Sequence, residues 1–254
     1  METKNDRAAW LAGGSVRCSP PPAPMQHPRR LLLLGAPGVG KGTQAELLCG
    51  AFGACHLSTG DIFRAAKSQE PCRRTPALAE ALDFMKHGHL VPDETVLHMV
   101  AERGDCLKCH GGFILDGFPR TLAQAVALDR LLTRAGICLD AVISYDLPFE
   151  QIVLRFIGRR TCSVCKAVFH VDARPPKMEG ACDRCGGALF HREDDNPASV
   201  HVRMEAYETS SAPLVHYYED RHVMVHVSAA GTPEDVFART LSMLEDHPDF
   251  PARR

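Results

Sequence analysis

From Arg30 onward, short apolar runs alternate with longer amphipathic stretches. Apolar runs separated by helices are typical of a parallel sheet that is covered on both faces. The runs predict strands at Leu31–Leu34, Phe113–Leu115, Ala141–Ser144 and Val223–Val227. The amphipathic stretches predict helices at 41–51, 75–87, 93–103, 121–135, 149–158, 197–218 and 233–245. The predicted fold class is therefore α/β.

Two stretches interrupt this alternation, and we expect them to be insertions into a core that spans residues 29–250. Residues 58–91 have a helical pattern and no clear strand. Residues 160–191 hold four cysteines, several prolines and glycines, and little helical signal. Residues 1–28 contain five of the 18 prolines and show no apolar periodicity. They are predicted to be a disordered extension, with Met25 as an alternative start.

The composition is that of an ordinary globular protein, with 45% hydrophobic and 24% charged residues among 254. The 29 basic and 31 acidic residues nearly cancel, so no overall field attracts nucleic acid or a membrane surface. No apolar run approaches the roughly 18 residues of a membrane span. Eleven cysteines are an odd number, and the N-terminus does not resemble a signal peptide. We therefore expect a reducing, cytoplasmic location.

A glycine-rich loop joins the first predicted strand to the first predicted helix, with the sequence Gly35-Ala-Pro-Gly38-Val39-Gly40-Lys41-Gly42-Thr43. Such a loop turns successive backbone N–H groups toward a phosphate, and the helix N-terminus adds a favourable dipole. The lysine then reaches the β- and γ-phosphates of a nucleotide. The alternative is a glycine-rich turn without a ligand. Gly42 stands where the common motif has Ser or Thr.

This loop resembles the phosphate loop of the adenylate kinase family, and further motifs resemble that family in the same order. They are Ser58-Thr-Gly-Asp-Ile-Phe-Arg64, Gly112-Phe-Ile-Leu-Asp116-Gly-Phe-Pro-Arg120-Thr, Gly158-Arg159-Arg160 and Arg192-Glu-Asp194-Asp195-Asn. The resemblance implies a parallel P-loop kinase core with helices on both faces, an inserted helical lobe for the nucleoside monophosphate at 58–91 and an inserted zinc lid at 160–191. It implies a monomeric enzyme that transfers a phosphoryl group reversibly from Mg-ATP to AMP, giving two ADP.

Transfer to a monophosphate needs cations more than a general base, because the acceptor phosphate is already anionic. The resemblance assigns three arginines to the acceptor, namely Arg64, Arg120 and Arg192. It assigns Arg159 to the ATP phosphates, and Arg155 and Arg203 are expected to complete a ring around the transferred group. Arginine suits this role because its planar fork binds phosphate oxygens in pairs. The implied catalytic set is Lys41, Arg120, Arg155, Arg159, Arg192, Arg203 and Asp116.

Asp116 ends the second apolar run. A carboxylate at the carboxyl end of a parallel strand, beside a phosphate loop, is well placed to hold Mg²⁺ through water. The alternative for Asp116 is a helix N-cap. Asp61 has the same alternative, as the cap of a helix that starts at Ile62. Asp194 and Asp195 either orient arginines of the lid or mark a solvated hinge.

Thr59 and Gln124 are expected to select adenine, since both occur in adenylate kinases and a glutamine amide pairs with donor and acceptor atoms. The implied AMP-binding residues are Thr59, Arg64, His89, Leu90, Val91, Gly117, Phe118, Pro119, Arg120, Gln124, Arg192 and Arg203. The implied ATP-binding residues are Gly38, Val39, Gly40, Lys41, Gly42, Thr43, Arg159, Val168, Phe169 and Pro233. The chain departs from the family near Pro71–Arg74, with about four extra residues, and at Phe169, where a tyrosine is frequent.

Four cysteines have the spacing of a zinc site, Cys162-x₂-Cys165-x₁₆-Cys182-x₂-Cys185. Four protein ligands leave no open position, so we expect a structural Zn²⁺, as in the zinc lid of one branch of the family. Unligated thiols and a nucleic-acid-binding zinc ribbon are the alternatives. For the second pair, Cys106 and Cys109 beside His110, we expect buried or half-buried thiols, with a metal site as the alternative.

Two other functions remain as alternatives. The first is a kinase of another nucleoside monophosphate, which Thr59 and Gln124 disfavour. The second is a non-catalytic, nucleotide-gated zinc-ribbon protein, which the full set of lysine, aspartate and arginines disfavours. The expected partners are the nucleotides ATP, AMP and ADP, without nucleic acid or membrane.

Overall fold

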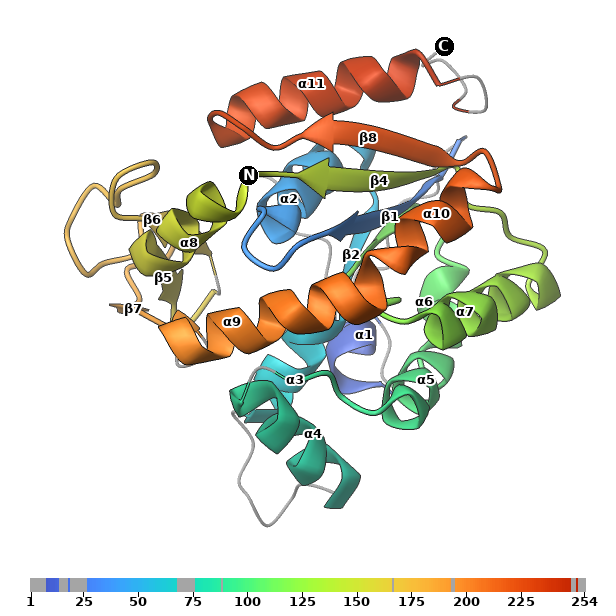
Figure 1. Cartoon of the computed structure of the whole chain (residues 1–254), viewed down its shortest axis with the longest axis horizontal. Helices are drawn as coiled ribbons and strands as arrows, with labels where there is room; N and C mark the ends of the chain where they lie inside the picture. Colours follow the sequence, from blue (N-terminus) through green and yellow to red (C-terminus); the bar gives the residue numbers. More distant parts are fainter. Residues whose placement is uncertain are drawn as a thin grey trace.

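A parallel five-stranded sheet lies at the centre of a computed structural model, which describes residues 8–13, 18, 27–67, 76–87, 89–165, 167–192, 195–247 and 250. The strand order is β2-β3-β1-β4-β8 (Figure 1). The strands are β1 (Arg29–Gly35), β2 (Cys55–Ser58), β3 (Gly112–Asp116), β4 (Ala141–Asp146) and β8 (Met224–Ser228). Nearly all residues of the three central strands are buried, as a sheet covered on both faces requires. The predicted α/β class is confirmed.

Alternate residues of β1 enter two different cores, because successive side chains of a strand point to opposite faces. Leu31 and Leu33 pack with residues of α2 (Lys41–Phe52) and α11 (Pro233–Glu245). Leu32 and Leu34 pack into the larger core on the other face. The helices that contribute to this core are α1 (Ala8–Ala12), α3 (Thr59–Lys67), α4 (Pro76–Lys86), α5 (Asp93–Ala101), α6 (Gly104–Leu107), α7 (Leu122–Arg134) and α10 (Pro213–Glu219).

The strand register gathers the ends of three strands at one edge of the sheet. Asp116 pairs with both Ser58 and Leu33, and Gly35 pairs with Tyr145. The chain leaves β1 and β3 at this edge, and ligands of such sheets bind in the crevice at the carboxyl ends of the strands. The register therefore places the glycine-rich loop beside Asp116.

The stretch between α8 (Phe149–Gly158) and α9 (Pro197–Ala206) forms a separate antiparallel sheet of order β6-β5-β7. Its strands are β5 (Arg159–Cys162), β6 (Val168–His170) and β7 (Leu189–Phe190). Arg184 of this sheet's loops donates to Glu46 of α2 over 2.8 Å, which holds the lid against the core. A π-helical turn, Tyr207–Ser211, joins α9 to α10, so the helix predicted at 197–218 consists of three segments.

Three elements differ from the predictions. The prediction of a disordered segment at 1–28 is wrong for Ala8–Ala12, which forms α1 because Trp10 buries its ring in the core and is only 1% exposed. Strand β2 escaped prediction because its four residues mix apolar and polar types. Helix α3 begins at Thr59, three residues before the expected start at Ile62. The extra residues Pro71–Arg74 lie outside the described part of the chain.

Within the described residues, no helix has the length and apolar character that crossing a membrane demands.

Candidate active site

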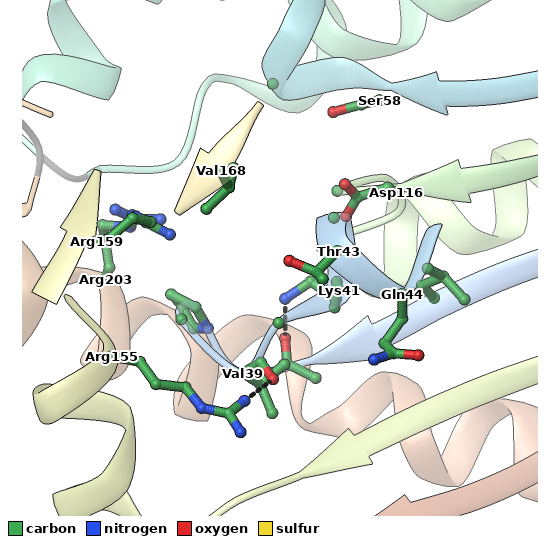
Figure 2. A pocket seen from close by; sticks show the side chains of 18 of the residues that line it. Val39, Lys41, Thr43, Gln44, Ser58, Asp116, Arg155, Arg159, Val168 and Arg203 are labelled. Carbon is green, nitrogen blue, oxygen red and sulfur yellow. Dashed lines mark hydrogen bonds between the residues drawn. The ribbon is translucent and has the colours of Figure 1, made fainter. Parts of the chain in front are cut away.

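A cleft of about 330 Å³ opens at the carboxyl ends of β1 and β3, between the glycine-rich loop, α3, α9 and the lid. Figure 2 shows Lys41, Thr43 and Asp116 on one side of this cleft and Arg159 and Arg203 on another, with Val168 of the lid above them. The predicted phosphate loop and all six predicted arginines therefore line one cavity.

The glycine-rich loop needs glycine at two positions. Gly38 and Gly40 have φ of +82° and +106°, in the region that other residues avoid. A Cβ on Gly38 would also lie 2.6 Å from the Phe156 ring, so the loop packs directly onto α8. Lys41 then opens α2, and its Nζ donates to the carbonyls of Gly35 and Ala36 over 2.6 and 2.9 Å.

The charge of Lys41 is costly in this cleft before any anion binds. The pKa of Lys41 is lowered to about 8, chiefly by burial and also by the charges of Arg120, Arg203 and Arg159, while Asp116 acts in the opposite direction. The three arginines are thus close enough for their charges to repel the Lys41 ammonium group. A polyphosphate in the cleft would relieve this repulsion, because each of these cations would gain an anionic partner.

Asp116 is an ionised carboxylate at the floor of the cleft. Burial raises its pKa, but a hydrogen bond from His56, whose Nε2 lies 3.4 Å away, and the charges of His56 and Lys41 outweigh this effect, so the pKa is lowered. The alternative of a helix N-cap is wrong, because Thr121 caps α7. An ionised oxygen donor beside Lys41 and Thr43 fits a divalent cation of the Mg²⁺ type.

Asp195 aligns two of the predicted arginines. Its buried carboxylate accepts from Nε of Arg159 over 2.7 Å and from a second nitrogen of the same side chain, and it lies 3.7 Å from Arg203. Both guanidinium groups stack on the Phe156 ring, at 4.8 and 5.0 Å from its centroid. Of the two alternatives for Asp195, orientation of arginines is therefore correct, while Asp194 lies outside the described residues.

Arg155 lines the same cleft as the other predicted arginines, and its guanidinium also holds two loops together. Its guanidinium donates to Val39 O over 2.6 Å (Figure 2). It also donates to Ala229 O over 2.7 Å. It therefore ties the phosphate loop to the loop between β8 and α11. Arg155 and Arg159 lie one helical turn apart and differ only in their hydrogen-bond partners, so the sequence does not predict the contacts of Arg155.

Thr59 and Gln124 form hydrogen bonds that connect the residues predicted to bind the acceptor, AMP. The Thr59 hydroxyl donates to Gly117 O over 2.9 Å. The amide of Gln124, which is buried, accepts from Arg120 N and donates to Asp93 over 2.8 and 2.7 Å. Asp93 was missed in the sequence, although it stands in the first turn of a helix directly after a proline.

Asp61 and Arg64 form an ion pair on α3. The guanidinium of Arg64 lies 2.5 Å from the Asp61 carboxylate, and Arg64 also lines the cleft. The alternative of a helix cap at Asp61 is wrong, because α3 has already begun at Thr59. In the lid, Arg192 donates to Thr161 over 2.9 Å.

The four lid cysteines converge on one point, with all their Sγ atoms within 4.8 Å of one another. Tetrahedral zinc bound at about 2.3 Å would separate its sulfur ligands by about 3.8 Å, so the spacing fits a closed metal site. Backbone N–H groups of Val164 and Arg184 donate to Cys162 and Cys182, both over 3.4 Å. Such bonds stabilise thiolates, which a metal requires.

Cys106 and Cys109 do not belong to any group that could hold a metal among the residues described. Instead, Cys109 Sγ lies 3.2 Å from Cys55 Sγ at the start of β2. Burial raises the pKa of Cys106 to about 11, which keeps this thiol protonated. The expectation of half-buried thiols fits this geometry.

Comparison with known proteins decides the family. A family model described as adenylate kinase matches residues 33–223, which is most of the chain. The match includes every sequence motif on which the resemblance rests, from the glycine-rich loop to Asn196. The chain belongs to the adenylate kinase family.

Curated adenylate kinases from several bacteria are similar to the chain over most of their length. The protein from Carboxydothermus hydrogenoformans is 46% identical over 216 residues, which are 85% of this chain and 99% of that protein. The protein from Caldicellulosiruptor bescii is 48% identical over 196 residues, which are 77% and 89% of the two chains. The protein from Streptomyces avermitilis is 44% identical over 217 residues, or 85% and 97%.

Most residues implied by resemblance to adenylate kinases line the cleft. On the acceptor side these are Arg64, Leu90, Gly117, Pro119, Arg120, Arg192 and Arg203, and on the donor side Gly38, Val39, Gly40, Lys41, Gly42, Thr43, Arg159, Val168, Phe169 and Pro233. Five implied AMP residues are not among the lining side chains, namely Thr59, His89, Val91, Phe118 and Gln124. Of these five residues, His89 is exposed, and the other four are buried in the protein next to the cleft.

Further residues line the cleft without having been predicted, among them Arg174, His170, Tyr207 and Ser211. Arg174 stacks over Phe169, with its Cζ 5.9 Å from the ring centroid. Neither residue type nor spacing distinguishes Arg174 from the other basic residues of the lid, so only the folded lid reveals its position.

Proposed function

We propose that the protein catalyses reversible transfer of the terminal phosphoryl group from Mg-ATP to AMP, giving two ADP. The single observation that carries the proposal is the convergence of Lys41 with arginines of α9, the lid and the loop after β3 on one cleft. Its relatives, curated as adenylate kinases, support the same reaction for this chain.

The chemistry that these residues supply is electrostatic. The transferred group spreads negative charge over its equatorial oxygens, and fixed cations stabilise that charge without reorganising. Asp195 holds Arg159 and Arg203 as a rigid pair, so their N–H donors need not be ordered during the reaction. The phosphate of a monophosphate attacks as an anion, and no side chain has to remove a proton.

Two metals belong to the proposal. Mg²⁺ bound with ATP would neutralise negative charge on the phosphates. The Asp116 carboxylate would hold it from the floor of the cleft, with the Thr43 hydroxyl nearby. Zn²⁺ would be held by the four lid thiols, where a closed ligand set gives it a structural role.

The lid is proposed to exclude water. Without closure, the same cations would also favour attack by water on ATP. The ion pair of Arg184 with Glu46 and the position of Val168 and Phe169 over the cleft support this role. We further propose a cytoplasmic location, since none of the described cysteines forms a disulfide. A monomeric state is proposed on the resemblance to adenylate kinases alone.

A coupled assay with ATP and each of AMP, GMP, CMP and UMP tests the proposal. Formation of ADP from AMP, with much slower use of the other three, is the expected result. A strong preference for another monophosphate would favour the first alternative, and nucleotide binding without transfer would favour the non-catalytic zinc-ribbon protein.

Gln124→Ala is expected to raise KM for AMP about tenfold and to weaken the preference for AMP over the other monophosphates. The amide holds Arg120 N and Asp93 together, and a glutamine edge at the acceptor side complements adenine. Steady-state kinetics with the four acceptors measure the change. Gln151→Ala, the same substitution at an exposed position of α8, serves as the control. Unchanged selectivity in Gln124→Ala would show that adenine is recognised elsewhere.

A further inference from the structure

Helix α1 lies outside the stretch that the family model matches, yet it is built into the core. Trp10 is 1% exposed and packs among residues of β2, α3 and α5. Figure 1 shows α1 beneath the sheet, beside α3 and α5. A segment without a counterpart in the matched region therefore contacts the elements that carry the acceptor side.

The indole of Trp10 is bonded to the point where the acceptor lobe leaves the sheet. Its Nε1 donates to Ser58 O over 2.9 Å in a buried contact. Ser58 ends β2 and lines the cleft, and the next residue, Thr59, begins α3 and bonds to Gly117. Because a buried indole N–H needs its acceptor, α1 and this junction are held in register.

Arg103 ties α1 to α5. Its Nε donates to Trp10 O over 2.6 Å, and its Nη1 donates to Met99 O over 2.8 Å. The last carbonyls of a helix have no partner within the helix, so one buried guanidinium satisfies the ends of two helices. Gly13 allows this approach, because a Cβ there would lie 2.7 Å from the Arg103 Cζ.

The opposite end of α5 carries Asp93, which accepts hydrogen bonds from Gln124 and Thr121 over 2.7 and 2.8 Å. Helix α1 is thus connected to both residues expected to select adenine: to Thr59 through Ser58, and to Gln124 through Arg103 and α5.

We propose that α1 is an intramolecular brace of the acceptor site, in which Trp10 and Arg103 are positioning residues for AMP. The brace fixes α3 and α5 relative to each other, so that Thr59 and Gln124 are ordered before AMP binds. Among the described residues, no hydrogen bond of Trp10 or Arg103 leads directly to Lys41 or to the lid. Loss of the brace therefore weakens binding of AMP and leaves binding of ATP unchanged. This inference rests on the proposed function only for the identity of the acceptor.

Fluorescence tests the docking of α1 without any assay of activity, because Trp10 is the single tryptophan of the chain. A docked indole emits at short wavelength and resists quenching by acrylamide. Arg103→Lys keeps the positive charge but lacks the fork that reaches two carbonyls, so Trp10 is expected to become several times more accessible to the quencher. Emission of a fully solvated indole from the folded wild-type chain would overturn the brace.

Binding and kinetics test its effect on the acceptor. Trp10→Phe keeps most of the apolar contact and removes the N–H donor. It should raise Kd and KM for AMP about fivefold, which is about 1 kcal/mol, with values for ATP unchanged. Leu244→Ala is the stability control, because it opens a cavity in the core on the other face of the sheet.

The control should lower Tm without changing Kd for AMP. Equal losses of AMP and ATP affinity in Trp10→Phe, or a loss of AMP affinity in Leu244→Ala as well, would show a general effect of stability and overturn the proposal. The wild-type assay with four acceptors separates the two hypotheses. If another monophosphate is preferred, the proposed function is wrong, and the brace is tested by the shift in affinity for that acceptor.

Discussion

Lys41→Met is expected to lower kcat by about three orders of magnitude or more. The ammonium group lies where the glycine-rich loop meets α2, within the field of Asp116, Arg120, Arg203 and Arg159. A cation at this position neutralises charge that develops on the transferred group, and removal of one preorganised donor typically costs about 10²–10³ in rate. Lys41 also organises the loop through the carbonyls of Gly35 and Ala36, so a larger loss follows. Steady-state kinetics with ATP and AMP measure it.

Lys108→Met is the matched control, since this lysine directly follows α6, is exposed, and lies 3.9 Å from Asp105. It should keep wild-type kcat. A Lys41→Met enzyme with near-normal turnover would refute the electrostatic account of the cleft. Arg120→Ala extends the test to the acceptor side, and its loss of rate should be similar, because Arg120 lines the same cavity.

Loss of activity in Lys41→Met will not come from loss of folding, since the nucleotide-free variant should be more stable than the wild type at pH 7. The folded pKa of about 8 lies below the usual lysine pKa of 10.5, so the unfolded chain binds more protons between these values. The cost of charging Lys41 in the folded chain is absent above about pH 10.5, grows as the pH falls, and is complete below about pH 8. Melting curves should show a Tm several degrees higher for the variant at pH 7 and a smaller difference at pH 10.

How far the sequence predicts this protein depends on whether a feature is local. The strand at Leu31–Leu34 and the loop to Lys41 are recognisable because apolar runs, glycines and a lysine stand in a fixed order. Short elements such as β2 have no periodicity of their own. They are strands because Leu57 and Ser58 pair with β3, which is a property of the folded sheet.

The sequence also does not predict which groups a side chain contacts in the folded protein. Arg155 and Arg159 look alike in the motif, but one donates to carbonyls of two loops and the other to Asp195. Trp10 stands in a proline-rich stretch that predicts no helix. An aromatic side chain buries about 150–250 Å², and burial of the Trp10 ring helps to order a five-residue helix there. The sequence thus predicts the chemistry of the cleft better than the contacts that position it.

Replacing Cys162 with Ser is expected to release about one zinc per chain and to lower Tm by about 10 °C. The four thiols lie within 4.8 Å of one another, and the small lid sheet has a core of only a few apolar residues beyond these cysteines. A bound zinc would therefore supply most of the free energy that folds the lid, and structural zinc sites contribute on this scale.

The same site cannot polarise substrate, because a closed set of four thiolates leaves no open position. Activity of Cys162→Ser measured well below its Tm should therefore stay within a few-fold of wild type, while the melting curve shifts. Cys106→Ser is the matched control: it removes a thiol outside the cluster and should leave the zinc content unchanged. Elemental analysis, melting curves and the kinase assay on the same preparations decide the matter. Two results would show that these ligands are wrong and would refute the structural zinc lid. One is a wild-type protein that purifies without metal, and the other is loss of zinc in Cys106→Ser but not in Cys162→Ser.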